Sequence, residues 1–274
     1  MPRGMTIERL ADGWSATIPG SPHPAIVQVA PLHGRPFLHP LRSPSGRLLT
    51  EDRATHHPWQ HGLYCGLNGI DGAGFWTEGL HPDPHRQATD GRIRCSGSGP
   101  VDGGWEVRSD WCRAGGEVLL RDRLELRPAC DEQGWWCDID WRITAVGSRH
   151  FEAYDYGGLF LRMPVHDGTA CDLRTDRGAL LQPAADGGRF AWVALAISEN
   201  GPPAGLAIID HAGNEGHPVP WRIDGQHGIG PSPCRLGART LADGACDRRR
   251  YRVIAFDGPP DAARIASLVP GVQS

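Results

Sequence analysis

The chain has 274 residues, with 37 glycines, 24 prolines and a formal net charge of −4 at pH 7. Because helix breakers are spread along most of the chain, long helices are disfavoured. All 28 basic residues are arginines, and the lack of lysine excludes Schiff-base chemistry, pyridoxal phosphate anchoring and a phosphate-loop lysine. Charges of both signs are mixed without the basic stripe of a nucleic-acid-binding protein, so a small molecule is the expected partner.

The eight cysteines lack the two-residue spacing of zinc ribbons and redox motifs, so we expect reduced thiols. Residues 1–16 contain no apolar run of the signal-peptide kind, and no stretch approaches the roughly 20 apolar residues of a membrane span. These features predict a soluble, cytoplasmic protein without a membrane partner. They leave the oligomeric state open, including a homo-oligomer.

Alternating apolar and polar residues in some segments, and turn signals that separate the other strand candidates, predict strands along most of the chain. In chain order the predicted strands cover residues 6–10, 14–18, 25–30, 37–42, 91–95, 105–111, 118–127, 135–145, 158–162, 190–197, 205–209, 220–223 and 250–256. Segments 118–127 and 135–145 alternate most regularly and predict an antiparallel hairpin joined across residues 128–134. The one predicted helix covers residues 259–268, which open with a proline pair and then show helical spacing of apolar residues.

So many strands favour two packed antiparallel sheets over a small barrel. The chain shows no internal repeat, linker or low-complexity segment. We therefore predict an all-β fold in one domain spanning residues 1–274: a large antiparallel two-sheet sandwich with one short C-terminal helix.

The densest group of functional side chains follows residue 55. His56, His57 and His61 occur within six residues, and the proline and glycines around them favour a loop that leads into a strand. Three imidazoles in a loop can converge on a metal or a substrate, or can simply bond backbone carbonyls. The nearby rings of Trp59 and Trp76 favour a sugar cleft, because sugar rings present apolar C–H faces to aromatic side chains.

Two other segments add polar groups near aromatic residues. Glu78 comes two residues after a tryptophan, where burial would raise its pKa and suit it to acid–base catalysis, although a solvated strand end is the alternative. Segment 152–158 contains Glu152, Asp155 and Tyr156 before a pair of glycines, and the next strand ends in Arg162. Some of these side chains must be structural, because alternation places them on opposite faces.

A third cluster follows the apolar segment 205–209. It contains His211, Asn214 and His217 and leads to Trp221. A polar loop at the end of a buried strand is a common place for a site, although a turn whose side chains serve only the backbone is the alternative. We predict one cleft lined by the loops 56–61 and 211–221.

Together these segments resemble the PmoA-like family, a bacterial family of largely unknown function. The resemblance rests on Arg35-Pro36-Phe37, the segments 57–63 and 68–76, Tyr156-Gly157-Gly158-Leu159, the segment 205–218, and Tyr251-Arg252-Val253. It implies a β-sandwich of the galactose-mutarotase type and a role in sugar catabolism. Fold resemblance alone does not establish chemistry.

Three functional hypotheses follow. The first is an enzyme acting on a sugar or glycoside, as an epimerase, lyase or hydrolase, with His57, His61, His211 and Glu78 as catalytic acids and bases. The second is a divalent-metal hydrolase, lyase or oxygenase, in which Glu78, Asp155 or Glu152 completes a two-histidine set. The third is a non-catalytic sugar-binding protein. In each, substrate contacts are predicted from His56, Trp59, Asn68, Trp76, Tyr156, Arg162, Asn214, His217 and Trp221.

Overall fold

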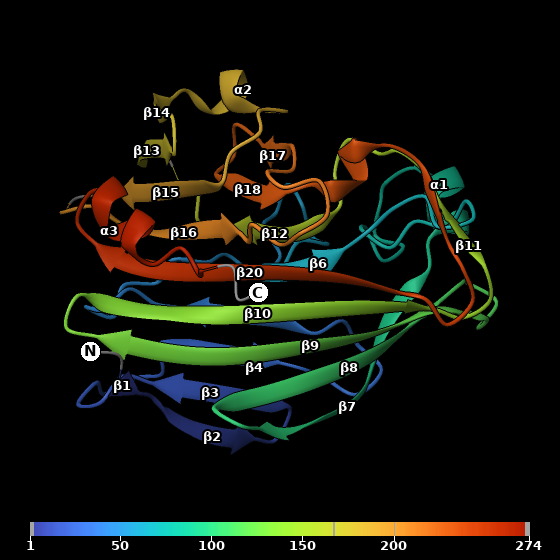
Figure 1. Ribbon diagram of the computed structural model, residues 1–274, viewed down its shortest axis with the longest axis horizontal. Coiled ribbons are helices and arrows are strands. Elements are labelled where there is room, and N and C mark those ends of the chain that lie inside the picture. The colour runs from blue at the N-terminus through green and yellow to red at the C-terminus, as the bar shows by residue number, and fades with distance from the viewer. Residues whose placement is uncertain (1–2, 167, 200, 272–274) are drawn as a thin grey trace.

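A computed structural model describes residues 3–166, 168–199 and 201–271. Within these residues the chain forms two large sheets and a small one, and every ladder between named strands is antiparallel. In Figure 1 the long strands of one large sheet cross the front of the molecule, and strands of the other pass behind them. The predicted all-β, two-sheet sandwich is confirmed.

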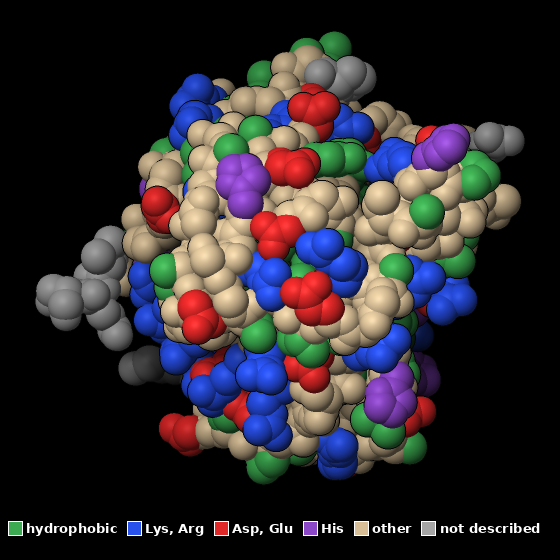
Figure 2. Space-filling model, turned by 90° about the vertical axis from the view of Figure 1, so that its right-hand side faces the viewer, with side chains coloured by type: hydrophobic (Ala, Val, Ile, Leu, Met, Phe, Trp, Pro, Cys, Tyr) green, Lys and Arg blue, Asp and Glu red, His purple; other side chains and the backbone are tan. Residues whose placement is uncertain are grey.

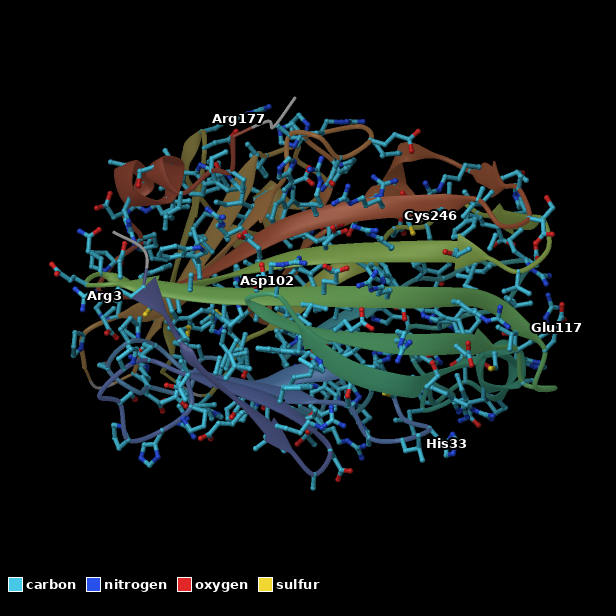
Figure 3. All side chains as sticks on the ribbon, turned by 60° about the horizontal axis from the view of Figure 1, so that its bottom comes forward. Arg3, His33, Asp102, Glu117, Arg177 and Cys246 are labelled. Atoms are coloured by element: carbon cyan, nitrogen blue, oxygen red, sulfur yellow. The ribbon has the colours of Figure 1, made fainter. Side chains whose placement is uncertain are left out.

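The first large sheet contains ten strands among the described residues. In spatial order its main path runs β14 (Gly178–Leu180), β13 (Ala170–Thr175), β15 (Trp192–Ser198), β16 (Ala204–Asp210), β20 (Cys246–Asp257), β10 (Gly134–Ala145), β9 (Val118–Asp131), β8 (Gly104–Cys112) and β7 (Arg92–Val101). The short strand β1 (Arg3–Gly4) pairs with β9. Figure 3 shows Arg3 and Glu117 at opposite ends of β9.

The second large sheet contains eight strands among the described residues. Its order is β17 (Trp221–Ile223), β18 (Gly228–Pro231), β12 (Gly158–Arg162), β6 (Leu63–Gly66), β5 (Phe37–Leu41), β4 (Ile26–Val29), β3 (Gly13–Thr17) and β2 (Thr6–Leu10). The small sheet pairs β11 (Arg149–Phe151) with β19 (Arg239–Leu241). As predicted, the histidine-containing loop leads directly into a strand, β6.

The predicted hairpin is confirmed, with Trp141 opposite Leu124. Its turn is tighter than expected, because β9 continues through Pro128 to Asp131 and pairs there with Gly134. Pro128 lies between the residues of β9 that pair with β8 and those that pair with β1. A proline, which has no N–H to donate, is tolerated where one neighbouring strand has ended.

The space between the sheets is filled by apolar side chains of both sheets. The residues of β10 predicted to share one face are all buried, from Trp135 to Ala145 in steps of two. Trp141 stacks on Trp111 of β8 at 6.2 Å between ring centroids. Because this core includes residues from both large sheets, the hydrophobic effect holds the two layers together.

Short helices cover parts of the sandwich. The predicted C-terminal helix is present as α3 (Ala262–Ser267), capped by the Asp261 carboxylate, which accepts hydrogen bonds from the N–H groups of Ala263 and Arg264. Its Ile265 packs with Trp192 and Trp136 on the outer face of the ten-stranded sheet. Three further short helices were not predicted: α1 (Pro84–Thr89), α2 (Gln182–Ala185) and the 3₁₀ helix η1 (Pro233–Leu236).

None of the helices formed by the described residues has the length and apolar character needed to cross a bilayer. All eight cysteines lie in the described residues and are free thiols, as predicted. The single-domain organisation and the cytoplasmic location stay predictions.

Candidate functional site

A small aromatic cluster on the outer face of the eight-stranded sheet is the foundation of the candidate site. Tyr64 of β6 and Phe160 of β12 project from neighbouring strands, away from the main core, and pack against Trp76. This placement follows from β-strand alternation, because the adjacent residues Leu63 and Leu161 belong to the core between the sheets. The cluster leaves aromatic surface on a face of the sheet that lies outside that core.

A cavity of about 190 Å³ lies over this cluster and is called the aromatic pocket below. Its aromatic lining residues are Trp59, Trp76, Tyr156 and Phe160, and its polar lining residues are His57, Gln60, Thr77, His81, Arg86, Arg222 and Asp224. The rings pack tightly, with 4.9 Å between the ring centroids of Trp76 and Tyr156. Four residues predicted to act together, His57, Trp59, Trp76 and Tyr156, therefore line one pocket.

His57 presents a neutral imidazole to this pocket. Burial and the positive charge of Arg162 lower the pKa of His57 to about 4. Its Nδ1 atom is buried and has no hydrogen-bond partner among the described residues. The ring packs edge-on against Trp59 at 5.2 Å and against the exposed His56 at 5.0 Å. His57 is thus uncharged at neutral pH, and its ring lines the pocket.

Arg162 supports the floor of the pocket and is fully buried. Its Nε donates to Gln60 Oε1 at 2.6 Å, and its two terminal nitrogens donate to the Asp224 carboxylate at 2.7 and 3.2 Å. A further bond reaches the carbonyl of Gln226. We predicted that Arg162 would hold substrate hydroxyls. Its donors instead join β12 to the loop after β17. Arg162 itself does not line the pocket, whereas its partners Gln60 and Asp224 do.

His61 lies beside the pocket but does not line it. Its Nδ1 bonds Asp52 Oδ1 at 2.6 Å, its Nε2 lies 3.5 Å from Glu78 Oε2, and its ring stacks on Phe37. Burial opposes protonation of this imidazole, yet the bonds with Asp52 and Glu78 raise the pKa of His61. His61 therefore lies between two carboxylates that favour its protonated form.

Glu78 belongs to the same network. Its burial opposes ionisation, but the charge of Arg35 and the bond with His61 lower its pKa, contrary to the raised pKa that we predicted. Arg35 Nε lies 3.4 Å from Glu78 Oε2, and its terminal nitrogens donate to the carbonyls of Phe75 and Trp76. An ionised, ion-paired Glu78 is not a general acid at neutral pH.

Asn68, Glu152 and Asp155 do not line the aromatic pocket. The side-chain oxygen of Asn68 accepts bonds from the backbone N–H groups of Phe75 and Trp76 at 3.1 and 3.3 Å, which orients the Trp76 segment. Glu152 and Asp155 are exposed. Within the described residues, no three histidine, cysteine or acidic side chains are arranged to hold a metal ion.

The 211–221 loop contributes to a different cavity. His211 lines a depression over β10 and β20, and its Nδ1 accepts a bond from the Gly213 N–H. Asn214 donates to the Asp210 carboxylate and the Arg250 carbonyl at 2.7 Å, and His217 bonds Asp210 at 3.1 Å. The single cleft that we predicted from both loops is therefore not formed: His211, just after β16, lines a cavity over the ten-stranded sheet, whereas His57 lines the aromatic pocket on the eight-stranded sheet.

Trp221 is also misassigned as a substrate contact. Its side chain is fully buried in the core, and its indole N–H donates to the Phe190 carbonyl at 2.8 Å. No ring face of Trp221 is open to a ligand. Residue type alone cannot distinguish a core tryptophan from one that lines a cavity.

Several pocket residues were not identified from the sequence. Asp224 and Arg222 come from β17 and the loop after it, and Arg86 and His81 come from the segment around α1. An Asp-Pro step, typical of a helix start, precedes Arg86: the Asp83 carboxylate accepts a bond from the His85 N–H at 2.9 Å. That signal could have located α1, but not its position over the pocket.

Residues 25–270 match the family described as "Family of unknown function (DUF6807)". The chain belongs to this family. The match neither supports nor contradicts the PmoA-like resemblance, which stays a prediction. No curated protein matches the chain significantly.

Among solved structures, the chain is similar to the GH36 alpha-galactosidase AgaA from Geobacillus stearothermophilus, with 10% sequence identity and a TM-score of 0.39. The alignment covers 93% of this chain and 41% of that one. The chain thus spans about two fifths of the length of this structure.

Proposed function

We propose that this family member binds a sugar or glycoside in the aromatic pocket and acts on it by acid–base chemistry. The supporting observation is that the aromatic side chains of Trp59, Trp76 and Tyr156 line one cavity together with the neutral imidazole of His57. Sugar rings offer C–H faces to aromatic side chains and hydroxyls to polar ones. A volume of about 190 Å³ is below the range of about 300–1,000 Å³ typical of drug-sized ligands, and favours a single ring.

Each group of side chains in the pocket has its own role in this proposal. Trp59 and Tyr156, which are only half-buried, stack on the sugar and orient it, and the buried Trp76 packs behind them. The neutral imidazole of His57 accepts a proton from a substrate hydroxyl and so acts as a general base. Asp224, whose pKa the charge of Arg162 lowers against the effect of its burial, supplies a fixed negative charge that accepts hydroxyl hydrogen bonds.

Two variants test this proposal. We expect Trp59→Ala to weaken sugar binding about tenfold through loss of a stacking face, as measured by isothermal titration calorimetry with glucose, galactose and their methyl glycosides. We expect His57→Gln to keep binding and to abolish product formation, as measured by mass spectrometry. The matched control is His23→Gln, since His23 is exposed and does not line the pocket.

The outcomes separate three cases. Binding with turnover that requires His57 supports the enzyme. Binding that requires Trp59, without any product in the wild type, supports the alternative of a non-catalytic sugar-binding protein. If no sugar or glycoside binds, or if both variants behave as the wild type does, the sugar proposal is wrong.

A further inference from the structure

The aromatic pocket opens onto a wider cleft of about 830 Å³. Arg86, Tyr156 and Arg222 line both cavities and so form the boundary between them. Asp186 and Arg235 lie in the outer part of the cleft. Figure 2 shows the end of the molecule that carries α1, where arginine and acidic side chains are interspersed.

Arg86 is a cation at this boundary without a matching anion. Its Nη2 donates to the hydroxyl of Tyr156 at 3.0 Å and to that of Tyr154 at 3.4 Å, and its Nη1 lies 3.0 Å from His81 Nε2. No carboxylate of the described residues forms an ion pair with it. Since a guanidinium has five N–H donors, Arg86 has donors left for a ligand.

The two phenols strengthen this arrangement. A tyrosine hydroxyl that accepts a hydrogen bond still has its own hydrogen to donate. Burial raises the pKa of Tyr154 to about 12, so its hydroxyl stays protonated at neutral pH. Arg86 and the hydroxyls of Tyr154 and Tyr156 therefore offer N–H and O–H donors on one side of the boundary.

The neighbouring charges add to the positive potential. Arg222 and Arg235 share one carboxylate, Asp186, at 3.2 and 3.0 Å. Asp155 is exposed in the outer cleft, and Asp224 is paired with the buried Arg162. The two cavities and their supporting Arg162 thus contain four guanidinium groups, those of Arg86, Arg162, Arg222 and Arg235, against the carboxylates of Asp155, Asp186 and Asp224.

We infer that the ligand of the aromatic pocket carries an anionic oxygen group, a carboxylate or a phosphate, which binds at Arg86 between Tyr156 and Arg222. This inference rests on the proposed function and narrows its substrate class to acidic or phosphorylated sugars. The sugar ring occupies the aromatic pocket while the anionic group lies at its opening. Charge-assisted hydrogen bonds from a planar guanidinium suit either group.

Calorimetric titration with glucose, glucuronate, glucose 6-phosphate, acetate and inorganic phosphate tests this inference. We expect glucuronate or glucose 6-phosphate to bind at least about tenfold more tightly than glucose, because hydrogen bonds to charged groups are the stronger ones. Arg86→Gln removes this advantage, so this variant binds the charged sugars no more tightly than it binds glucose. Arg94→Gln is the matched control, since Arg94 is exposed on β7 and lines neither cavity.

The outcomes distinguish this inference from the proposed function. If glucose binds as tightly as both charged sugars, or if Arg86→Gln leaves all affinities unchanged, the inference of an anionic group on the ligand is wrong. The proposal that the pocket binds a sugar is then unaffected. If acetate or phosphate binds at Arg86 and no sugar binds better than these ions, the anion site stands and the sugar proposal is wrong. If none of the five probes binds, both are wrong.

Discussion

At the scale of single residues, the environment of His57 decides which proton chemistry the pocket can perform. An imidazole with a pKa of about 4 is neutral throughout the physiological range and becomes charged only in acid. As a base it is weak, so it suits hydrogen bonding and proton transfer with a strongly polarised substrate. Beside the pocket, the bonds with Asp52 and Glu78 shift the pKa of His61 in the opposite direction.

We expect the His57 imidazole to titrate near pH 4 and sugar binding to be constant from pH 8 to about pH 5. Burial beside Arg162 penalises the charged ring, so protonation is delayed until the solution is more acidic. NMR titration of the ring Cε1–H signals measures this, and the His57→Gln protein identifies the signal by its absence. A midpoint near 6.5 contradicts the buried environment.

Asp122 is a second residue with an unusual pKa, far from the pocket. Its Oδ1 is buried without a partner among the described residues, although the residue as a whole is half-buried, and its Oδ2 accepts the Trp141 indole N–H at 2.9 Å. Burial raises the pKa of this carboxyl from 3.8 to about 6, against the lowering effect of that bond. Compared with the unfolded chain, the folded protein therefore disfavours the ionised form of Asp122.

We expect Asp122→Asn to stabilise the protein by about 1–3 kcal/mol at pH 8, since the folded state then no longer contains a buried charge. The folded pKa exceeds the unfolded one, so the wild type gains stability as pH falls from about 6 to about 4, and the difference from the variant shrinks. Urea denaturation of the wild type and the variant at pH 8 and at pH 4 measures the difference in their free energies of unfolding at each pH. Equal stability of the two proteins at pH 8, with the exposed Asp102→Asn as control, contradicts this account.

At the scale of elements, regular alternation was a reliable guide. It located the long strands β9 and β10 and their face toward the core, because one side of each contacts water or charged residues. It missed β6, all four residues of which are buried. With both faces covered, a strand shows no period of two.

The Asp261 side chain caps the short helix α3, and its contribution to stability can be measured. We expect Asp261→Ala to destabilise the protein by about 1 kcal/mol, because two N–H groups at the start of the helix lose their acceptor. Asp261→Asn is the matched control and keeps most of the stability, since asparagine caps equally well. Urea denaturation provides the measurement. Similar losses in both variants would point to lost charge rather than lost capping.

At the scale of the whole molecule, the sequence could predict a sandwich but not which loops meet. The histidine-rich segment was recognised because its residues are adjacent in the chain. Arg86 and Asp224 were missed because they reach the same pocket from remote elements, and His211 was wrongly grouped with His57 because spatial proximity depends on strand order. Sheet order is set by long-range packing, which local composition does not encode.

A core that joins both large sheets has a consequence for unfolding. We expect one cooperative transition, since loss of either sheet exposes the apolar face of the other. Thermal unfolding followed by near-ultraviolet and far-ultraviolet circular dichroism should give coincident curves. Two separate transitions would contradict the predicted single domain.

The distribution of the ten tryptophans allows ligand binding in the pocket to be followed by intrinsic fluorescence. Nine are buried, with at most 8% of their surface exposed, and Trp59 alone is half-buried. A collisional quencher such as iodide or acrylamide therefore reaches mainly Trp59. A ligand that stacks on this ring shields it, so the chain carries its own fluorescent reporter of pocket occupancy, readable without any label.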